Sequence, residues 1–262
     1  MPATAQRVQS LASVAGCCCK VVHSPGVRFG MTDAAAAKLI ITIDGPAGAG
    51  KSTIASRLAR KLGYINLESG AMYRALALKA IEWDVGFEDE VALLKLAQDS
   101  RIELEPSFGG NRVLLDGHDV TERVREADVT EAASQVSVHP QVRGWMVARQ
   151  REMGAGGGVV MEGRDIGTKV FPGADVKVFL DADPVVREQR RLEQLKAKGV
   201  ATKTLAQSVA AELRERDYRD RHRATSPLEP AKDAVLLDST SLSEDEVLHR
   251  VEELVSQKLQ RA

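Results

Sequence analysis

Short apolar runs alternate with longer helical patterns along most of the chain. Runs rich in β-branched and other apolar side chains predict buried strands at 40–44, 63–67, 159–161, 176–181 and 234–237. Between these runs, apolar residues recur at helical spacing, as at Ile54, Leu58 and Leu62. Strands that alternate with helices are typical of a parallel sheet covered by helices. The pattern therefore predicts an α/β fold with a five-stranded parallel sheet between helices.

One segment departs from this alternation. Polar and apolar side chains alternate at 101–105, a glycine-rich turn follows at 109–111, and residues 112–116 alternate less cleanly. We expect a small antiparallel β subdomain inserted into the α/β domain. An insertion of this kind commonly carries a substrate-specific surface.

A phosphate-binding motif follows the first apolar run. Its residues are Gly45, Pro46, Ala47, Gly48, Ala49, Gly50, Lys51, Ser52 and Thr53, with the spacing G-x-x-x-x-G-K-[ST], and a helical pattern follows directly. The glycines let backbone N–H groups turn toward a polyphosphate, and the helix N-terminus adds the positive end of its dipole. Lys51 can then reach the β- and γ-phosphates, and Ser52 can bind Mg²⁺. The motif predicts the use of a nucleoside triphosphate but does not name the reaction.

Composition narrows the classes of function. The chain has 36 lysines and arginines against 37 aspartates and glutamates, so no overall field favours nucleic acid or an anionic membrane as a partner. No apolar run approaches the length of about 18 residues that spans a bilayer. The three cysteines are consecutive at 17–19, which excludes a disulfide framework and lacks the usual spacing of zinc ligands. The main body of the chain is therefore expected to suit a reducing cytoplasm.

Residues 1–30 differ in composition from the rest of the chain, because they contain basic but no acidic residues. Three interpretations remain open: a transit-type peptide, a lipoprotein signal that ends at Cys17, or upstream sequence before a true start at Met31. Export does not fit a chain that uses ATP. We therefore favour a disordered leader or a mis-assigned start over residues 1–36.

Two groups of polar residues that follow predicted strands are candidates for a binding site. Glu162-Gly163-Arg164-Asp165 follows a predicted buried strand, and ligands of open parallel sheets bind beyond the carboxyl ends of the strands. A charged turn is the other interpretation of this segment. Arg74 lies in the first turns of the helix after the second strand, where it could clamp a phosphate, although such an arginine is more often a surface residue.

A third group lies on a late helix. Arg216, Asp220 and Arg223 recur at i, i+4 and i+7 and therefore share one helix face. Arginine without lysine in this segment favours planar, bidentate recognition of phosphate. A solvated, salt-bridged face explains the same pattern equally well.

Together, these motifs resemble the bacterial cytidylate kinase family over roughly residues 38–259. The segments that carry the resemblance are I-T-I-D-G-P-A-G-A-G-K-S-T from Ile41, S-G-A-M-Y-R from Ser69, A-S-Q-V from Ala133, G-R-D-I-G-T from Gly163 and R-D-Y-R-D-R-H-R from Arg216. The first is shared by many phosphotransferases, but the five in this order are highly specific. The resemblance implies a P-loop kinase domain over 37–262, with a nucleoside-monophosphate-binding insertion at about 68–150 and a short helical lid at about 190–213.

The resemblance also implies an activity. Members transfer the γ-phosphoryl group of ATP to CMP or dCMP with Mg²⁺, giving ADP and CDP or dCDP. It further implies a cytoplasmic monomer that acts on small molecules in pyrimidine metabolism, without a nucleic acid or membrane partner.

The family's functional residues map onto this chain one by one. Lys51, Arg74, Arg164, Arg216 and Arg223 are implied as the residues that stabilise charge, with donor binding by residues 45–53 and metal binding by Ser52. The implied acceptor site comprises Ser69, Tyr73, Arg74, Ser134, Arg143, Arg164, Asp165, Arg216, Asp220 and Arg223. Within it, Arg74 and Arg164 would bind phosphate, Ser134, Arg143 and Asp165 would read cytosine, and the last three would close over the sugar and phosphates.

Some features limit this assignment. Glutamate stands at positions 68 and 162, where the family commonly has aspartate; the charge is kept and the side chain is longer. A kinase for another small acceptor, such as UMP, AMP or shikimate, is an alternative against which the cytosine-reading residues argue. An ATP-driven switch or binding module is another, but it leaves the arginines unexplained.

Overall fold

The computed structural model describes residues 38–107, 110–197 and 205–261, with the side chains of 205–208 left undescribed. The expectation of a disordered leader or mis-assigned start at 1–36 lies outside these ranges. In the described part of the chain, no helix is long and apolar enough to cross a membrane.

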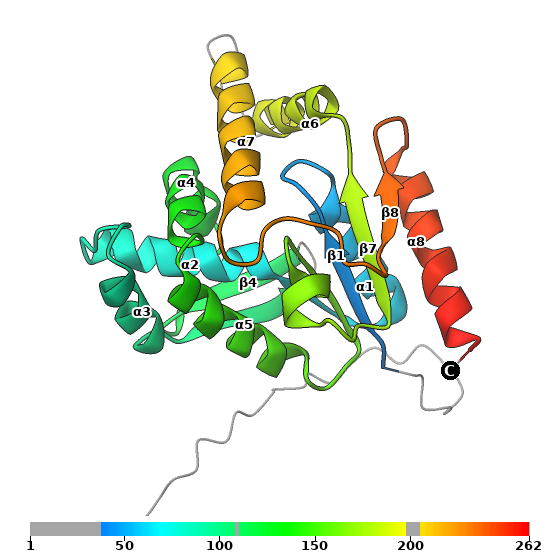
Figure 1. Ribbon diagram of the computed structural model, residues 1–262, viewed down its shortest axis with the longest axis horizontal. Helices are drawn as coiled ribbons and strands as arrows, with labels where there is room; N and C mark the ends of the chain where they lie inside the picture. Colours follow the sequence, from blue (N-terminus) through cyan, green and yellow to red (C-terminus); the bar gives the residue numbers. More distant parts are fainter. Residues whose placement is uncertain (1–37, 108–109, 198–204, 262) are drawn as a thin grey trace, which may run out of the picture. The chain divides into compact units, whose positions relative to one another are not determined.

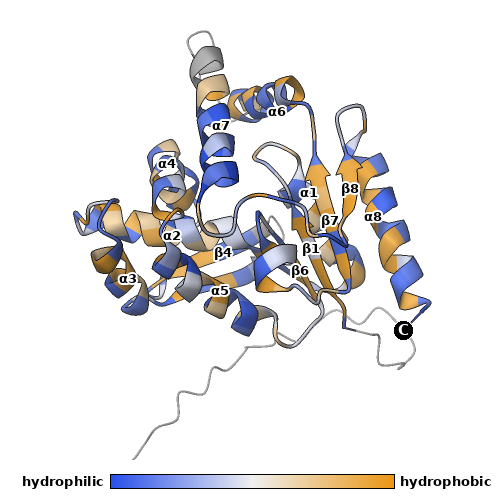
Figure 2. Cartoon of the chain, viewed as in Figure 1, coloured by the Kyte–Doolittle hydropathy of each residue, from blue (hydrophilic) through white to orange (hydrophobic). Residues whose placement is uncertain are grey.

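The centre of the fold is a parallel sheet of five strands, as the apolar runs predict (Figure 1). Its strands are β1 (Ile40–Asp44), β2 (Ile65–Glu68), β6 (Val159–Gly163), β7 (Val176–Asp181) and β8 (Val235–Asp238). They lie in the order β2-β6-β1-β7-β8, and every neighbouring pair is parallel. The central strands are predominantly hydrophobic (Figure 2), because both faces of a parallel sheet are buried.

Different elements cover the two faces of this sheet. Helices α1 (Lys51–Leu62) and α8 (Glu244–Leu259) lie on one face, where Ile41 and Ile43 of β1 are fully buried in a shared apolar cluster. The short π turn η2 (Ile166–Val170) packs on the other face, against apolar residues of β2 and β6.

The segment between β2 and β6 forms a subdomain with its own apolar core. Its elements are α2 (Ser69–Glu82), α3 (Glu90–Gln98), β3 (Ile102–Ser107), β4 (Gly110–Leu115), β5 (His118–Asp119), the short 3₁₀ turn η1 (Arg123–Arg125), α4 (Ala127–Val136) and α5 (Pro140–Gly154). The strands form an antiparallel sheet in the order β3-β4-β5, which confirms the inserted β subdomain. The two-residue strand β5 was not expected, because it is too short for a periodic pattern.

Helices α6 (Pro184–Ala197) and α7 (Leu205–His222) follow β7. The lid expected at about 190–213 covers the end of α6, the start of α7 and residues 198–204, which lie outside the described ranges. One arrangement of these helices is described, so closure of a lid stays a prediction.

The candidate residues meet because the strands are parallel. Register pairs Asp44 with Gly163 and Glu68 with Glu162, so the carboxyl ends of β1, β2 and β6 lie at the same edge of the sheet. The phosphate loop, the start of α2 and the turn containing Asp165 all begin at this edge.

Candidate active site

The predicted phosphate loop joins β1 to α1 as a cradle of backbone. A Cβ atom at Gly45 would lie 1.9 Å from the carbonyl oxygen of Leu180, so any side chain at this position is excluded. Gly50, the N-cap of α1, has a φ of 94° and offers no side-chain cap to the helix. The N–H groups of the first turn of α1 are therefore available to an anion.

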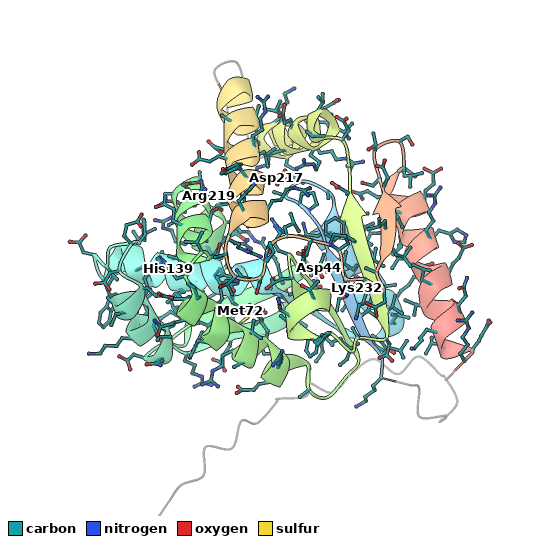
Figure 3. The ribbon with its side chains drawn as sticks, in the orientation of Figure 1. Asp44, Met72, His139, Asp217, Arg219 and Lys232 are labelled. Atoms are coloured by element: carbon teal, nitrogen blue, oxygen red, sulfur yellow. The ribbon has the colours of Figure 1, made fainter. Side chains whose placement is uncertain are left out.

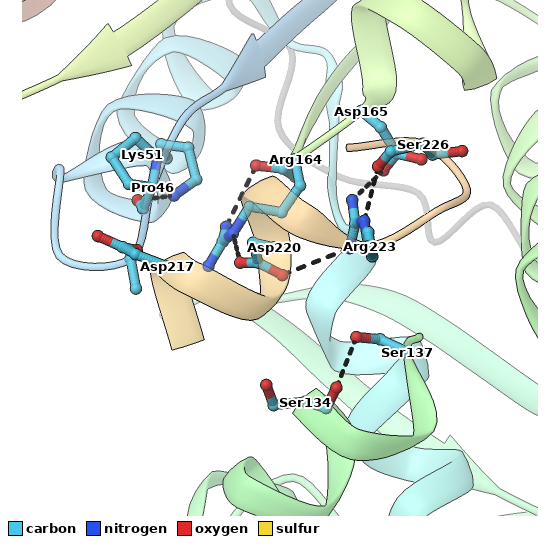
Figure 4. A network of polar contacts seen from close by, with 12 residues as sticks. Pro46, Lys51, Ser134, Ser137, Arg164, Asp165, Asp217, Asp220, Arg223 and Ser226 are labelled. Carbon is cyan, nitrogen blue, oxygen red and sulfur yellow. Dashed lines mark hydrogen bonds and ion pairs between the residues drawn. The ribbon is translucent and has the colours of Figure 1, made fainter. Parts of the chain in front are cut away.

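Lys51 is a buried cation at the start of α1. Its side chain is almost fully covered, and its Nζ donates to the carbonyl oxygen of Pro46 at 2.6 Å (Figure 4). Burial, and then the neighbouring guanidinium of Arg164, lower the pKa of Lys51 to about 7. No carboxylate of the described residues lies within ion-pair distance of its ammonium group. An anionic ligand would supply the missing countercharge.

Two glutamates lie behind the phosphate loop. The hydroxyl of Ser52 donates to the carboxylate of Glu162, and burial together with neighbouring Glu68 raises the pKa of Glu162. Glu68 accepts instead from Arg74, whose charge lowers the pKa of Glu68 against the opposing effect of burial. The longer side chains therefore contact the hydroxyl expected to bind the metal and the arginine expected to bind phosphate. A hydroxyl oriented by a carboxylate fits a Mg²⁺ ion, which prefers oxygen ligands.

A large cavity of about 770 Å³ opens above the phosphate loop. Lys51, Ser52, Arg74 and Arg216 line it, as expected for residues that bind phosphate groups. Arg74 is largely buried by its pair with Glu68, so the interpretation of Arg74 as a surface residue is wrong.

A second, smaller cavity of about 50 Å³ lies beside the first. It is lined by every residue of the predicted acceptor site except Arg74, which faces the larger cavity. Arg216 lines both cavities; burial, and then Arg164, lower its pKa to about 10. The two cavities therefore meet at one guanidinium group.

Buried polar groups surround the smaller cavity. Arg143 is 2% exposed, donates to Asp165 and to the Ser137 carbonyl oxygen at 3.0 Å, and lies over the ring of Tyr73. The hydroxyl of Ser134 and the Nε of Arg143 are buried, and neither has a hydrogen-bond partner among the described residues. Native proteins rarely leave such groups unpaired, so a polar ligand or a water molecule is expected to contact them.

Asp220 connects the smaller cavity to α7. It accepts from Nε of Arg164 at 2.8 Å and from Nη1 of Arg223 at 3.4 Å, and Nη2 of Arg223 lies 3.8 Å from Asp165 (Figure 4). Asp220 and Arg223 are buried, so the interpretation of this helix face as solvated is wrong. Arg164 and Arg223 are instead held by carboxylates around the cavity.

Comparisons with known proteins agree with this geometry. A family model described as cytidylate kinase matches residues 41–257. The chain belongs to the cytidylate kinase family. Cytidylate kinase of Geobacillus kaustophilus is 49% identical over 85% of this chain and 98% of its own length. The enzyme of Pasteurella multocida is 45% identical over 85% and 97%. The solved structure of TT1252 from Thermus thermophilus covers 84% of this chain and 97% of its own, at 22% identity and a TM-score of 0.40.

In this member of the cytidylate kinase family, the structure adds residues that the motifs did not indicate. Arg187 of α6 is buried and donates to Asp217 of α7 and, at 3.0 Å, to the carbonyl oxygen of Ala47, so it ties the phosphate loop to α7. Arg125 and Arg191 line the larger cavity. None of these three arginines belongs to a motif that the sequence analysis singled out.

Proposed function

We propose that this protein transfers the γ-phosphoryl group of ATP to CMP and dCMP. The observation that carries this proposal is the smaller cavity, which lies next to the larger, arginine-lined cavity. It holds a buried ion pair and the Ser134 hydroxyl, for which the described part of the chain offers no hydrogen-bond partner. The family membership supports the same reaction, because the relatives are named cytidylate kinases.

Selection of cytosine would rest on Ser134, Arg143 and Asp165. The carboxylate of Asp165 can accept from the exocyclic amine of cytosine, whereas uracil has a carbonyl oxygen at that position. A buried acceptor left unpaired by uracil would cost about 1–3 kcal/mol, or roughly tenfold to hundredfold in selectivity. Arg143 donates to Asp165 and so orients its carboxylate for this contact.

Donor binding would use the backbone cradle and the buried ammonium of Lys51. Mg²⁺, held by Ser52 and by the phosphates, would neutralise charge that develops between the donor's phosphates during transfer. The triphosphate would replace the Pro46 carbonyl as the main partner of Lys51 and return the lysine to its charged form.

The acceptor phosphate would lie between Arg74 and Arg164, with Arg216 between donor and acceptor. A phosphate monoester is largely ionised at neutral pH, so its attacking oxygen needs no general base. The protein therefore contributes positioning and charge stabilisation. Closure of the segment at about 190–213 would exclude water and so limit ATP hydrolysis.

An acceptor series tests this proposal. ADP release is measured with MgATP and, separately, CMP, dCMP, UMP, AMP, shikimate or no acceptor. We expect rapid turnover with CMP and dCMP and background rates with the others. Rapid turnover with another acceptor would replace cytidylate as the substrate. Slow turnover that no acceptor accelerates would favour an ATP-driven switch. A monomeric state and a cytoplasmic location stay predictions.

A further inference from the structure

The carboxylate of Asp44 joins the two halves of the site. Asp44 is the last residue of β1, directly before the phosphate loop, and it is 5% exposed (Figure 3). Its oxygens accept from the backbone N–H groups of Ile166 and Gly167 at 2.8 and 2.7 Å. These two residues directly follow Asp165. One side chain therefore connects the start of the donor loop to the segment that carries the proposed cytosine-reading carboxylate.

The turn after Asp165 needs such a partner. In η2, the N–H groups of Lys169 and Val170 donate to the Asp165 carbonyl at 2.8 and 3.3 Å. The N–H groups at the start of a helical turn have no carbonyl partner within it. Asp44 supplies both acceptors from another strand, as an N-cap side chain does locally.

The opposite end of the turn is also held. Arg151 of α5 donates to the carbonyl oxygens of Lys169 and Val170 at 2.6 and 2.9 Å. The turn is thus fixed at both ends, and Asp44 holds the end next to Asp165.

Asp44 occupies this position at an electrostatic cost. Burial raises the pKa of Asp44 to about 6, although its two backbone hydrogen bonds act in the opposite direction. The charge of Asp165 raises it further, and that of Lys51 lowers it. A neutral asparagine would avoid the burial of charge, but its amide nitrogen would face one of the two N–H donors. Two acceptor oxygens are what the turn requires.

Packing leaves the turn little freedom to move against β1. A Cβ atom at Gly167 would lie 3.0 Å from Oγ1 of Thr42 and 3.3 Å from Oδ2 of Asp44. Both contacts are tighter than ordinary van der Waals separation. The backbone of the turn therefore lies directly on the end of β1.

We propose that Asp44 is a positioning residue for base selection: by holding the N–H groups of Ile166 and Gly167, it sets Asp165 where it can face both Arg143 and the acceptor base. This inference rests on the proposed function. It adds a residue that contacts no substrate and lies 121 positions before the residue it orients.

Asp44→Asn tests the proposal, with Asp175→Asn as the matched control. Asp175 accepts from the backbone N–H of Ile40 at 2.9 Å, and the amide oxygen of asparagine can keep this single hydrogen bond. The control therefore removes a carboxylate charge at the opposite end of β1 without taking away an acceptor that the strand needs. For each variant, kcat and KM are measured with CMP, UMP and MgATP, and folding is checked by thermal unfolding. We expect Asp44→Asn to lower the CMP-to-UMP ratio of kcat/KM about tenfold, as for one lost buried hydrogen bond. The KM for MgATP should stay close to that of the control, and the control should keep the wild-type ratio.

Gly167→Ala provides a second test that leaves the Asp44 carboxylate in place. The added methyl group should push the turn away from β1 and lower the same ratio by a smaller factor. An unchanged ratio in the folded variants would overturn the proposal. So would an equal loss for CMP, UMP and MgATP, because that result would show a purely structural role. If the wild-type enzyme does not phosphorylate CMP, the proposed function fails; if it does and the ratio survives both substitutions, only the role of Asp44 fails.

Discussion

The two cavities are built in different ways. One contiguous stretch, residues 45–53, supplies the cradle of the larger cavity, with strand, loop and helix adjacent in the chain. The smaller cavity combines side chains from α2, α4, α5, the turn after β6 and the end of α7. A triphosphate can be recognised by backbone geometry and one cation, whereas a base needs groups placed in several directions. The proposed donor cradle is therefore local in the sequence, whereas the proposed acceptor site is a product of the tertiary fold.

The two cavities also differ in how far their buried charges are already paired with opposite charges. In the larger cavity Lys51 is a buried cation whose charge is disfavoured until an anion arrives. In the smaller cavity Arg143, Arg164 and Arg223 already pair with Asp165 and Asp220, which leaves one positive charge of this group uncompensated. The first cavity is prepared for a highly charged ligand. The arginines of the second are largely paired, as expected for a site that we propose binds a neutral base.

The largest effect should come from the donor side. Lys51→Met removes the ammonium group that would contact the transferred phosphoryl group, so kcat should fall roughly 10²–10³-fold with CMP and dCMP alike. Steady-state kinetics with both acceptors measures this loss. Lys61→Met is the matched control, because Lys61 lies on the same helix, α1, but is exposed and pairs with Glu252 of α8. This variant should keep the wild-type kcat. A loss confined to one acceptor would contradict the division between the cavities.

A smaller and selective effect is expected on the acceptor side. Asp165→Asn keeps the shape of the side chain but removes its charge, and its amide nitrogen can donate to the carbonyl oxygen of uracil. The CMP-to-UMP ratio of kcat/KM should fall roughly tenfold to hundredfold, with little change in the KM for MgATP. Competition between the two acceptors in one reaction measures the ratio directly. An undiminished ratio would remove Asp165 from base selection.

A weaker effect is expected where α7 meets α4. Arg219 of α7 (Figure 3) donates to Glu131 of α4 at 2.7 Å and lies 3.2 Å from Glu215 of its own helix. Glu131→Gln removes the contact between the two helices and should raise the KM for CMP about twofold to fivefold. The increase should be small because a partly exposed ion pair contributes little free energy. Glu215→Gln removes the same charge without separating the two helices and should leave KM unchanged. Equal effects of the two substitutions would show that the arginine's charge, and not the contact between helices, matters.

The last prediction concerns the number of protons taken up when MgATP binds. At pH 8, above the pKa of about 7 that burial gives Lys51, the ligand-free lysine is mostly neutral. Bound phosphates favour the charged form, so binding of MgATP should take up a proton at pH 8 and almost none at pH 6. Calorimetric titration in buffers of different ionisation enthalpy measures this uptake. Lys51→Met should abolish it; uptake that persists in this variant would assign the proton to another group.

Features formed by residues close together in the sequence could be predicted, and contacts between distant residues could not. The phosphate loop could be predicted because its geometry depends on glycines and a lysine within one short segment. The shared face of Arg216, Asp220 and Arg223 could be predicted from helical spacing, but a solvated face explained the spacing equally well until the burial of Asp220 was known. Arg187 carried no signal, because the carbonyl it holds belongs to a residue 140 positions earlier. The same is true of Asp44, which lies 122 and 123 positions from its two donors.

The sequence by itself determined the α/β alternation, the inserted β segment and the phosphate loop. Apolar period, glycine placement and motif order are local properties, so they could be read along the chain. Only the tertiary structure decided which carboxylate each arginine meets, that Arg216 faces both cavities, and that Asp44 holds the turn after Asp165. These contacts depend on the strand order β2-β6-β1-β7-β8, which brings distant loops to one edge of the sheet. That order is set by packing of the whole domain and by no single segment.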